Sequence, residues 1–170
     1  MDLWRLTEHP SLDGEGGRLY AARWNSKGAP IVYLAASPAG ALIEILVHLE
    51  LEDDEIPPIF TLLRIDVPGR LKIPQLRVPA GDAWKSNLTL TRALGDAWLK
   101  SRRSALARVP SAILPHTFNY LLNPLHPTPR ASRSPRPRAP HSTCAFSVSR
   151  APHIYPQRRK ICAVEESDLQ

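Results

Sequence analysis

The sequence predicts an α+β fold, a compact mixed sheet with flanking helices. Three observations lead to this class. Short apolar and β-branched stretches are interspersed with two longer amphipathic stretches, without the steady strand–helix alternation of a parallel α/β sheet. Hydrophobic residues make up 43% of the chain, which is enough for a buried core. The length of 170 residues suits one domain.

Charge and proline are distributed unevenly along the chain. Residues 1–126 carry 14 Lys and Arg against 13 Asp and Glu, whereas residues 127–170 carry 8 against 3. The second part also holds 7 of the 18 prolines, both cysteines and none of the 8 glycines. We therefore expect a nearly neutral folded domain over residues 1–126 and a disordered, basic Pro/Arg/Ser-rich tail over residues 127–170. The net charge of +6 is thus no sign of a basic nucleic-acid-binding fold.

Simple patterns exclude other classes of protein. No apolar run approaches the roughly 18–20 residues of a membrane span, and the N-terminus lacks the basic and then apolar plan of a signal peptide. The first 126 residues contain no cysteine for a disulfide or a thiolate metal site. His48 and His116 lack partners at metal-ligand spacing, so no metal is expected. We expect a cytoplasmic protein without membrane contact.

The first part of the chain predicts three strands. Residues 3–7 alternate apolar and polar side chains, which is typical of a strand. A loop is expected at residues 11–17, and a short strand at residues 19–24. Turn residues at 25–28 then lead into a buried, β-rich strand at residues 31–35.

Two helices and further strands follow. Ser37 is a good N-cap and Pro38 is tolerated at the first helical position, so a helix should run from there to about residue 50. Because this helix is apolar on most sides, we expect it to be deeply buried. A second, amphipathic helix is predicted at residues 88–103. The remaining segments are a strand at 59–67, an irregular stretch at 68–87, a short strand at 105–109 and an apolar segment at 118–122.

Glu44 is an anomaly within the first helix because it lies between Ile43 and Ile45. Burying a carboxylate is costly unless it is paired or hydrogen-bonded. One interpretation is an i,i+4 pair with His48 at the edge of the helix. The other interpretation is a carboxylate that lines a functional pocket.

Four further polar residues each have an ordinary interpretation. Arg23 could be a solvated strand end, and Tyr33 a core aromatic residue whose hydroxyl finds a partner. Ser111 follows Pro110, where serine is common turn chemistry, and Asn119 is more often a structural amide. None of the four is decisive alone.

Together these segments resemble a known family, the RES domain. The resemblance is carried by Arg-Trp-Asn (23–25), Ile-Val-Tyr-Leu-Ala (31–35), Ser-Pro-x-x-Ala-Leu-x-Glu-x-Leu-Val-His (37–48), Val-Pro-Ser-Ala (109–112) and Asn-Tyr-Leu-Leu-Asn-Pro-Leu-His-Pro (119–127). It covers about residues 2–127 in the family's order and spacing. The resemblance implies a fold like that of ADP-ribosyltransferases and the toxin of a RES–Xre toxin–antitoxin pair. It also implies NAD as the substrate, with no bound cofactor.

The resemblance places the family's catalytic residues at Arg23, Tyr33 and Glu44, and its serine at Ser111. Cleaving the nicotinamide–ribose bond builds an oxocarbenium-like centre, whose charge Glu44 could offset while it orients water or phosphate. Arg23 would bind the pyrophosphate, and the ring of Tyr33 would stack on nicotinamide. Ser111 would donate a hydrogen bond to ribose or phosphate. Asn119 is a weaker candidate at the edge of the pocket.

Three functions stay open on this basis. The first is NAD depletion by hydrolysis or phosphorolysis, and the second is transfer of ADP-ribose to a protein target. The third is RNA binding through the basic tail. The resemblance also implies a cognate Xre-like helix-turn-helix antitoxin, through which alone the toxin would meet nucleic acid. Assembly into a homo-oligomer stays open.

Two features depart from the family pattern. Ala22 stands where the family usually has glycine before the arginine. After residue 127 the chain loses the family's usual ending, so the RES-like domain over residues 1–126 is expected to be truncated. We hypothesise that the tail results from a frameshift near codon 127, which would impair stability or activity.

Overall fold

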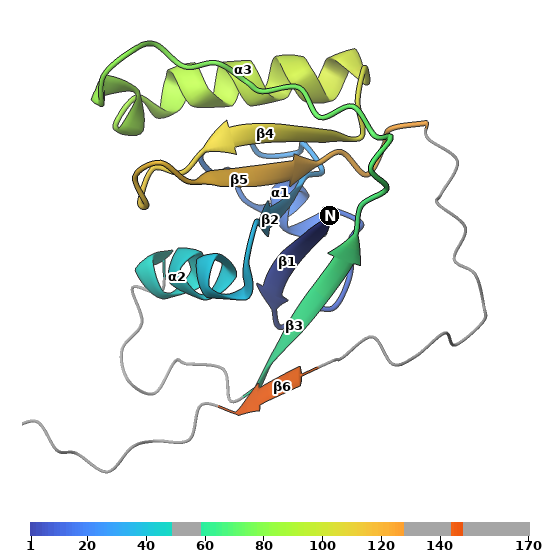
Figure 1. Cartoon of the computed structure of the whole chain (residues 1–170). Coiled ribbons are helices and arrows are strands. Elements are labelled where there is room, and N and C mark those ends of the chain that lie inside the picture. The colour runs from blue at the N-terminus through green and yellow to red at the C-terminus, as the bar shows by residue number, and fades with distance from the viewer. Residues whose placement is uncertain (49–58, 128–143, 148–170) are drawn as a thin grey trace, which may run out of the picture.

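The computed structural model describes residues 1–48, 59–127 and 144–147. Within them a single six-stranded sheet has the strand order β4-β5-β2-β1-β3-β6 (Figure 1). The strands are β1 (Asp2–Thr7), β2 (Val32–Ala35), β3 (Ile59–Asp66), β4 (Leu106–Pro110), β5 (Phe118–Leu122) and β6 (Cys144–Ser147). The helices are α1 (Glu15–Leu19), α2 (Pro38–His48), the short 3-10 helix η1 (Ala83–Lys85) and α3 (Leu88–Ser101).

The predicted α+β class is confirmed, with one correction to the sheet. Each pair of neighbouring strands is antiparallel, so the sheet is not mixed. The strand β2 lies between β1 and β5, and its residues therefore occupy the middle of the sheet. The strand β2 contacts α2, and its residue Tyr33 packs against the cluster that contains Trp98 and Leu99 of α3.

The core consists of two hydrophobic clusters that correspond to the two faces of the sheet. Alternate residues of a strand point to opposite faces, and Leu121 of β5 belongs to one cluster while Tyr120 belongs to the other. The first cluster joins α3 to the sheet through Trp98 and Leu99. Tyr33 packs against this same cluster, so its ring lies on the face that α3 covers.

The helix α3 follows its prediction closely. Its N-cap is Asn87, whose side chain accepts a hydrogen bond of 3.0 Å from the backbone N–H of Leu90. The helix ends at Ser101 rather than at residue 103, because Arg102 adopts the left-handed conformation with φ of 48°.

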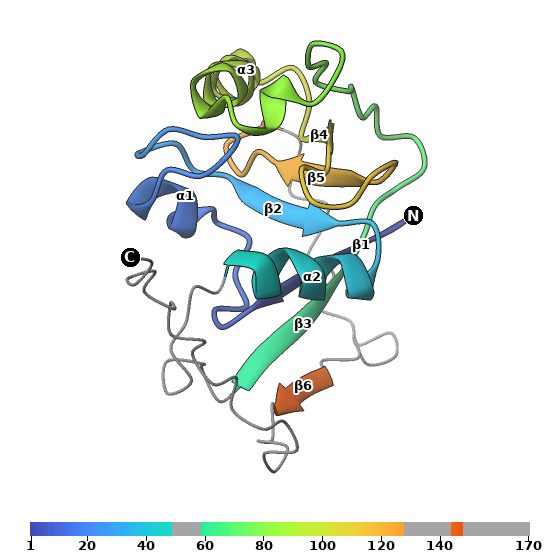
Figure 2. The same cartoon turned by 90° about the vertical axis from the view of Figure 1, so that its left-hand side faces the viewer.

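The helix α2 begins as predicted and is less buried than predicted. Ser37 accepts a hydrogen bond of 3.1 Å from the backbone N–H of Gly40, and Pro38 is the first helical residue. The expectation of deep burial is wrong, since Leu42, Leu46 and Val47 are 44%, 57% and 54% exposed. Only one side of α2, which includes the buried Ala41, packs on the sheet at β1 and β2 (Figure 2). Predicted helical residues 49 and 50 lie outside the described part of the chain.

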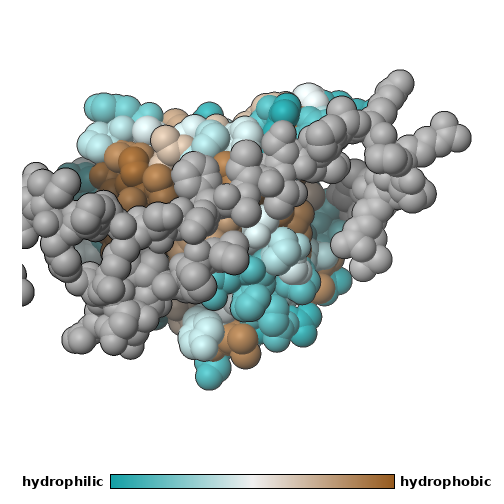
Figure 3. All heavy atoms as spheres, turned by 90° about the horizontal axis from the view of Figure 1, so that it is seen from below, coloured by the Kyte–Doolittle hydropathy of each residue, from teal (hydrophilic) through white to brown (hydrophobic). Residues whose placement is uncertain are grey.

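Exposed apolar side chains also appear on the surface of the molecule. Figure 3 shows them as brown areas among hydrophilic ones on the face seen from below.

No helix in the described residues combines the length and apolar character that a membrane crossing needs.

The segment between β1 and β2 differs from its prediction. The loop expected at residues 11–17 contains the start of α1, and the strand expected at residues 19–24 is absent from the structure. Glycine explains the difference, because α1 packs closely against the chain that leads into β2. A Cβ atom on Gly17 would lie 2.5 Å from the backbone oxygen of Ala29. After α1 the chain forms an irregular loop, in which Ala22 and Asn25 pair through a single backbone bridge.

The tail contributes one strand that the sequence analysis missed. Cys144–Ser147 form β6, which pairs antiparallel with β3 so that Phe146 is opposite Phe60. The expectation of a disordered tail is therefore wrong for these four residues. Residues 128–143 and 148–170 lie outside the described part, and for them the expectation stays a prediction.

Candidate active site

Glu44 projects from the middle of α2 toward the adjacent ends of β4 and β5. Its Oε1 atom accepts one hydrogen bond of 3.0 Å from the hydroxyl of Ser111 and another of 2.6 Å from the side-chain amide of Asn119. The structure thus brings together three of the predicted site residues, which are far apart in sequence. Two donors on one oxygen offset the cost of partial burial and fix the orientation of the carboxylate. The alternative pair with His48 involves a side chain outside the described part of the chain.

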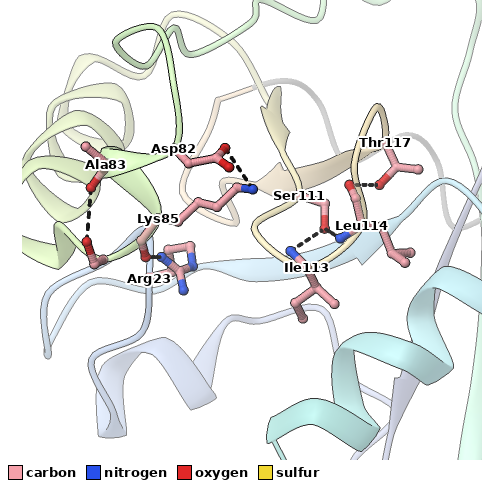
Figure 4. Close-up of polar contacts among 9 residues, drawn as sticks. Arg23, Asp82, Ala83, Lys85, Ser111, Ile113, Leu114 and Thr117 are labelled. Carbon is pink, nitrogen blue, oxygen red and sulfur yellow. Dashed lines mark hydrogen bonds and ion pairs between the residues drawn. The ribbon is translucent and has the colours of Figure 1, made fainter.

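Ser111 is a buried residue with all of its hydroxyl contacts within the protein. Its Oγ accepts hydrogen bonds from the backbone N–H groups of Ile113 (3.2 Å) and Leu114 (3.0 Å) and donates its proton to Glu44. The same turn is closed by the Thr117 hydroxyl, which donates to the Leu114 carbonyl at 2.8 Å (Figure 4). Ser111 therefore positions Glu44 in this structure. Its predicted role as a donor to ribose or phosphate would require the hydroxyl to turn away from that carboxylate.

The hydroxyl of Tyr33 is also fully engaged. It donates to the side-chain oxygen of Asn25 at 2.8 Å and accepts from the backbone N–H of Trp24 at 3.0 Å. Burial raises the pKa of Tyr33 well above its usual value of 10, although the N–H of Trp24 and the nearby charge of Arg23 oppose this shift. The hydroxyl therefore stays protonated at neutral pH. The aromatic ring, rather than the hydroxyl, is the part of Tyr33 that can serve a ligand.

Asn25 connects several segments through its side chain, although its sequence context predicts only a turn residue. It is fully buried, and its amide donates to the carbonyls of Gly17, Tyr20 and Ser26 at 3.1 Å each. Together with its bond to Tyr33, these contacts tie the loop after α1 to the middle strand of the sheet. The signal in the sequence was its place directly after Arg23 and Trp24, within a segment that the RES resemblance already used.

Arg23 lies within this loop and does not end a strand. Its Nη1 atom donates a hydrogen bond to the backbone carbonyl of Lys85, the last residue of η1 (Figure 4). Next to it, the buried Trp24 packs against Trp84 with ring centroids 6.1 Å apart. Arg92 of α3 also donates to the carbonyl of Ala22 at 2.9 Å. The interpretation of Arg23 as a solvated strand end is thus wrong, because the residue is half-buried and held between the loop and the segment before α3.

Strand register places Tyr33 of the first group of contacts close to Asn119, which holds Glu44. Ala35 of β2 is opposite Asn119 of β5, and Tyr33 is opposite Leu121. Tyr33 and Asn119 therefore point to the same face of the sheet as diagonal neighbours on adjacent strands, a relation that usually separates Cα atoms by about 7–8 Å. Asn119 holds the carboxylate of Glu44, and Trp24, the neighbour of Arg23 in sequence, donates its backbone N–H to the hydroxyl of Tyr33.

The shape of the surface adds little to this assignment. Two surface hollows of about 720 and 750 Å³ are lined by other residues, including Lys27 and Arg102 in the first and Lys72 and Arg103 in the second. Among the described residues there is no group of three or more His, Cys, Asp or Glu that could hold a metal ion. The site is therefore defined by its polar contacts and its strand register.

Comparisons with known proteins show the family of the chain. A model of the RES domain matches residues 2–147. The chain is 42% identical over 134 residues to "Toxin Res" of Pseudomonas putida. The aligned region covers 78% of this chain and 91% of the relative. It is 33% identical over 144 residues to the "Prs ADP-ribosylating toxin" of a Sphingobium species, with 79% and 85% covered.

A solved structure shares the fold. It is the crystal structure of the M. tuberculosis MbcT–MbcA toxin–antitoxin complex, with a TM-score of 0.54, 23% identity and coverage of 71% of this chain and 72% of that chain. The resemblance found in the sequence is thus confirmed, and the family match continues past residue 127 through β6. The chain belongs to the RES domain family.

Proposed function

We propose that this chain is the toxin of a toxin–antitoxin pair and that it depletes NAD by cleaving the nicotinamide–ribose bond. The observation that carries the proposal is the Glu44 carboxylate, fixed by Ser111 and Asn119 on the sheet face that also bears Tyr33. The names of its relatives, "Toxin Res" and "Prs ADP-ribosylating toxin", support the same class of activity.

Glu44 is the catalytic residue of this proposal. When the bond between the ribose C1′ and the pyridinium nitrogen breaks, nicotinamide keeps both electrons and leaves as a neutral molecule. The ribose carbon becomes electron-poor, as in glycoside hydrolysis. A fixed carboxylate offsets that charge and orients the attacking oxygen of water or phosphate. The attacking group then loses its proton to solvent or to the carboxylate.

Arg23 and Tyr33 bind and orient the substrate. The guanidinium of Arg23 has five N–H donors, of which the contact with the Lys85 carbonyl occupies one. The remaining N–H groups can donate hydrogen bonds to the pyrophosphate oxygens of NAD. The ring of Tyr33 is fixed by its hydroxyl contacts and offers a face on which nicotinamide stacks. In this scheme NAD is the substrate, and no resident cofactor takes part.

The proposed partner is a cognate Xre-like helix-turn-helix antitoxin that covers the pocket. The likeness of the fold to a chain solved in a toxin–antitoxin complex supports an antitoxin as the partner, and its Xre-like type rests on the sequence resemblance. The proposed location is the cytoplasm, where both NAD and such an antitoxin are present.

The test is an NAD assay on the purified chain, with and without phosphate. We expect NAD to be consumed and Glu44→Gln to lower the rate by at least about 100-fold, since it removes the charge that acts in the transition state. The matched control is Glu15→Gln, because Glu15 is an exposed residue of α1 whose ion pair with Arg18 lies on the surface. A soluble, folded chain that leaves NAD intact under both conditions would contradict the proposal.

Transfer of ADP-ribose to a protein is the second candidate, favoured by the name of the Sphingobium relative. It uses the same site with a protein side chain as the acceptor. Mass spectrometry of cell proteins after expression separates the two functions. ADP-ribose on a protein, absent with Glu44→Gln, would favour transfer, whereas free ADP-ribose or its phosphate would favour NAD depletion.

A further inference from the structure

We propose that Lys85 is a second phosphate-binding cation of this site, which together with Arg23 receives the pyrophosphate of a dinucleotide substrate. This inference rests on the proposed function and adds a residue outside the segments that carry the RES resemblance. Lys85 lies in the stretch predicted to be irregular, residues 68–87, where no motif points to it.

Geometry places Lys85 directly at the predicted phosphate-binding arginine. The guanidinium of Arg23 donates to the backbone carbonyl of Lys85, so the two residues are in contact. Figure 4 shows the Lys85 side chain extending from this contact to its ion-pair partner Asp82, on the side of Arg23 that faces the turn beginning at Ser111. A pyrophosphate bound by Arg23 would have this second cation beside it.

The backbone that carries Lys85 is firmly held. Trp84, which is only 6% exposed, packs against Trp24 in the first core cluster. The backbone N–H of Lys85 donates to the Asp82 carbonyl at 2.9 Å, and the N–H of Asn87 donates to the Trp84 carbonyl at 3.1 Å. The position of the lysine is thus determined by the core, and only its side chain needs to move when a ligand binds.

The present partner of the ammonium is easily replaced. Its Nζ atom forms an ion pair of 2.9 Å with Asp82, whose side chain is 83% exposed. A carboxylate that is so well solvated holds a cation weakly. A pyrophosphate bears two negative charges and would be held by Arg23 at the same time, so it should displace Asp82. Asp82 thus keeps the ammonium in place until substrate binds, and it competes with the substrate.

The test is steady-state kinetics with NAD on three variants and a control. Lys85→Gln is expected to raise KM about 5- to 10-fold with kcat within about two-fold of the original, since a charge-assisted phosphate contact is lost. Lys85→Arg should restore KM. Asp82→Asn should lower KM, because the competing carboxylate is gone. Lys100→Gln, an exposed lysine of α3, should change nothing.

Product inhibition distinguishes phosphate binding from a general structural effect. Lys85→Gln should weaken inhibition by ADP-ribose, which carries the pyrophosphate, and leave inhibition by nicotinamide unchanged. An unchanged KM for NAD, or an equal loss for both products, would overturn this inference while leaving the proposed function intact. If the unsubstituted chain cleaves no NAD, the proposed function fails instead, and this inference with it.

Discussion

At the scale of single residues, two asparagines hold the chemical groups of the site. Asn25 accepts a hydrogen bond from the hydroxyl of Tyr33, and Asn119 donates to the carboxylate of Glu44. Each amide uses a short, rigid side chain to connect segments that are distant in sequence. Their value lies in orientation, because a buried polar group with fixed partners has few alternative positions. The ordinary interpretations of Tyr33 and Asn119 as structural residues are therefore compatible with roles in the site.

The buried hydroxyl of Tyr33 makes stability depend on alkaline pH. Its pKa is raised above 10 in the folded state, whereas the unfolded chain has the usual value of about 10. The folded protein therefore binds this proton more tightly, and the contribution is fully present below pH 10 and is lost as pH rises above it. We expect the free energy of unfolding to fall as pH rises above about 10, and to fall less in Tyr33→Phe.

Urea denaturation of both chains at pH 8, 9, 10 and 11 measures this difference. At pH 8 the variant should be less stable by about 1–3 kcal/mol, because the Asn25 oxygen loses its donor in a buried place. The gap between the two chains should narrow as pH rises. A gap that stays constant over this range would show that the hydroxyl ionises alike in both states.

At the scale of elements, α3 and the loop of Arg23 are joined by several close contacts. Asp96 accepts a hydrogen bond of 3.0 Å from the backbone N–H of Ser26, and Arg92 binds the carbonyl of Ala22. Gly95 lies between these two contacts along the helix. A Cβ atom there would be 1.9 Å from the backbone oxygen of Trp24, so this glycine allows the helix and the loop to touch.

Gly95→Ala tests that contact against the ordinary preference of helices. Alanine favours a helix over glycine by about 1 kcal/mol, yet here the methyl group would push α3 away from the loop. We expect the variant to lose about 2 kcal/mol of stability or more and to bind NAD more weakly through displacement of Arg23. Urea denaturation and the KM for NAD measure the two effects.

Gly16→Ala in α1 is the matched control for this substitution. Nothing lies within 4 Å of the place that a Cβ atom on Gly16 would occupy, so the change should be neutral or stabilising by up to about 1 kcal/mol. Equal stability of Gly95→Ala and Gly16→Ala would show that α3 and the loop can separate at little cost.

Elements with local signals could be predicted, and those set by contacts between distant segments could not. The Ser37 and Asn87 regions begin helices as expected because their caps are encoded within three residues. The helix α1 was missed because its glycines disfavour a helix locally, and only the close approach to Ala29 explains them. The exposure of Leu42 and Leu46 was missed because an apolar helix resembles a buried one until its neighbours are known.

The residues of the site divide in the same way, into those that the sequence predicts and those that only the packing of distant segments determines. Glu44, Ser111 and Asn119 could be selected from the sequence through the family pattern, and the structure places them in contact. The role of Ser111 as a support for Glu44 could not be predicted, since it depends on where one hydroxyl proton points. Lys85 carries no local signal at all, because its place in the site comes from the packing of Trp84 on Trp24.

At the scale of the whole molecule, the site occupies one half of the sheet and the tail strand completes the other. The site residues come from the loop after α1, from β2, α2, η1 and β5, and from the segment after β4, whereas β6 pairs with β3 at the edge of the described sheet. The strand β3 is paired with β1 on its inner side from Asp66 to Thr61. Without β6, the outer backbone groups of residues 59–62 would form a free edge, which is a common site of aggregation.

A chain that ends at residue 127 should therefore be less stable by a few kcal/mol, since it loses several ladder hydrogen bonds, and should self-associate as its concentration rises. Its NAD cleavage per folded molecule should stay within a few-fold of the full chain, because β1 separates β3 from the site. Urea denaturation, light scattering and the NAD assay measure these three properties. The control is a chain that ends at residue 147, which keeps β6 and should match the full chain in all three. If the two shortened chains proved equally stable and monomeric, the β3–β6 pairing would have no part in holding the sheet together.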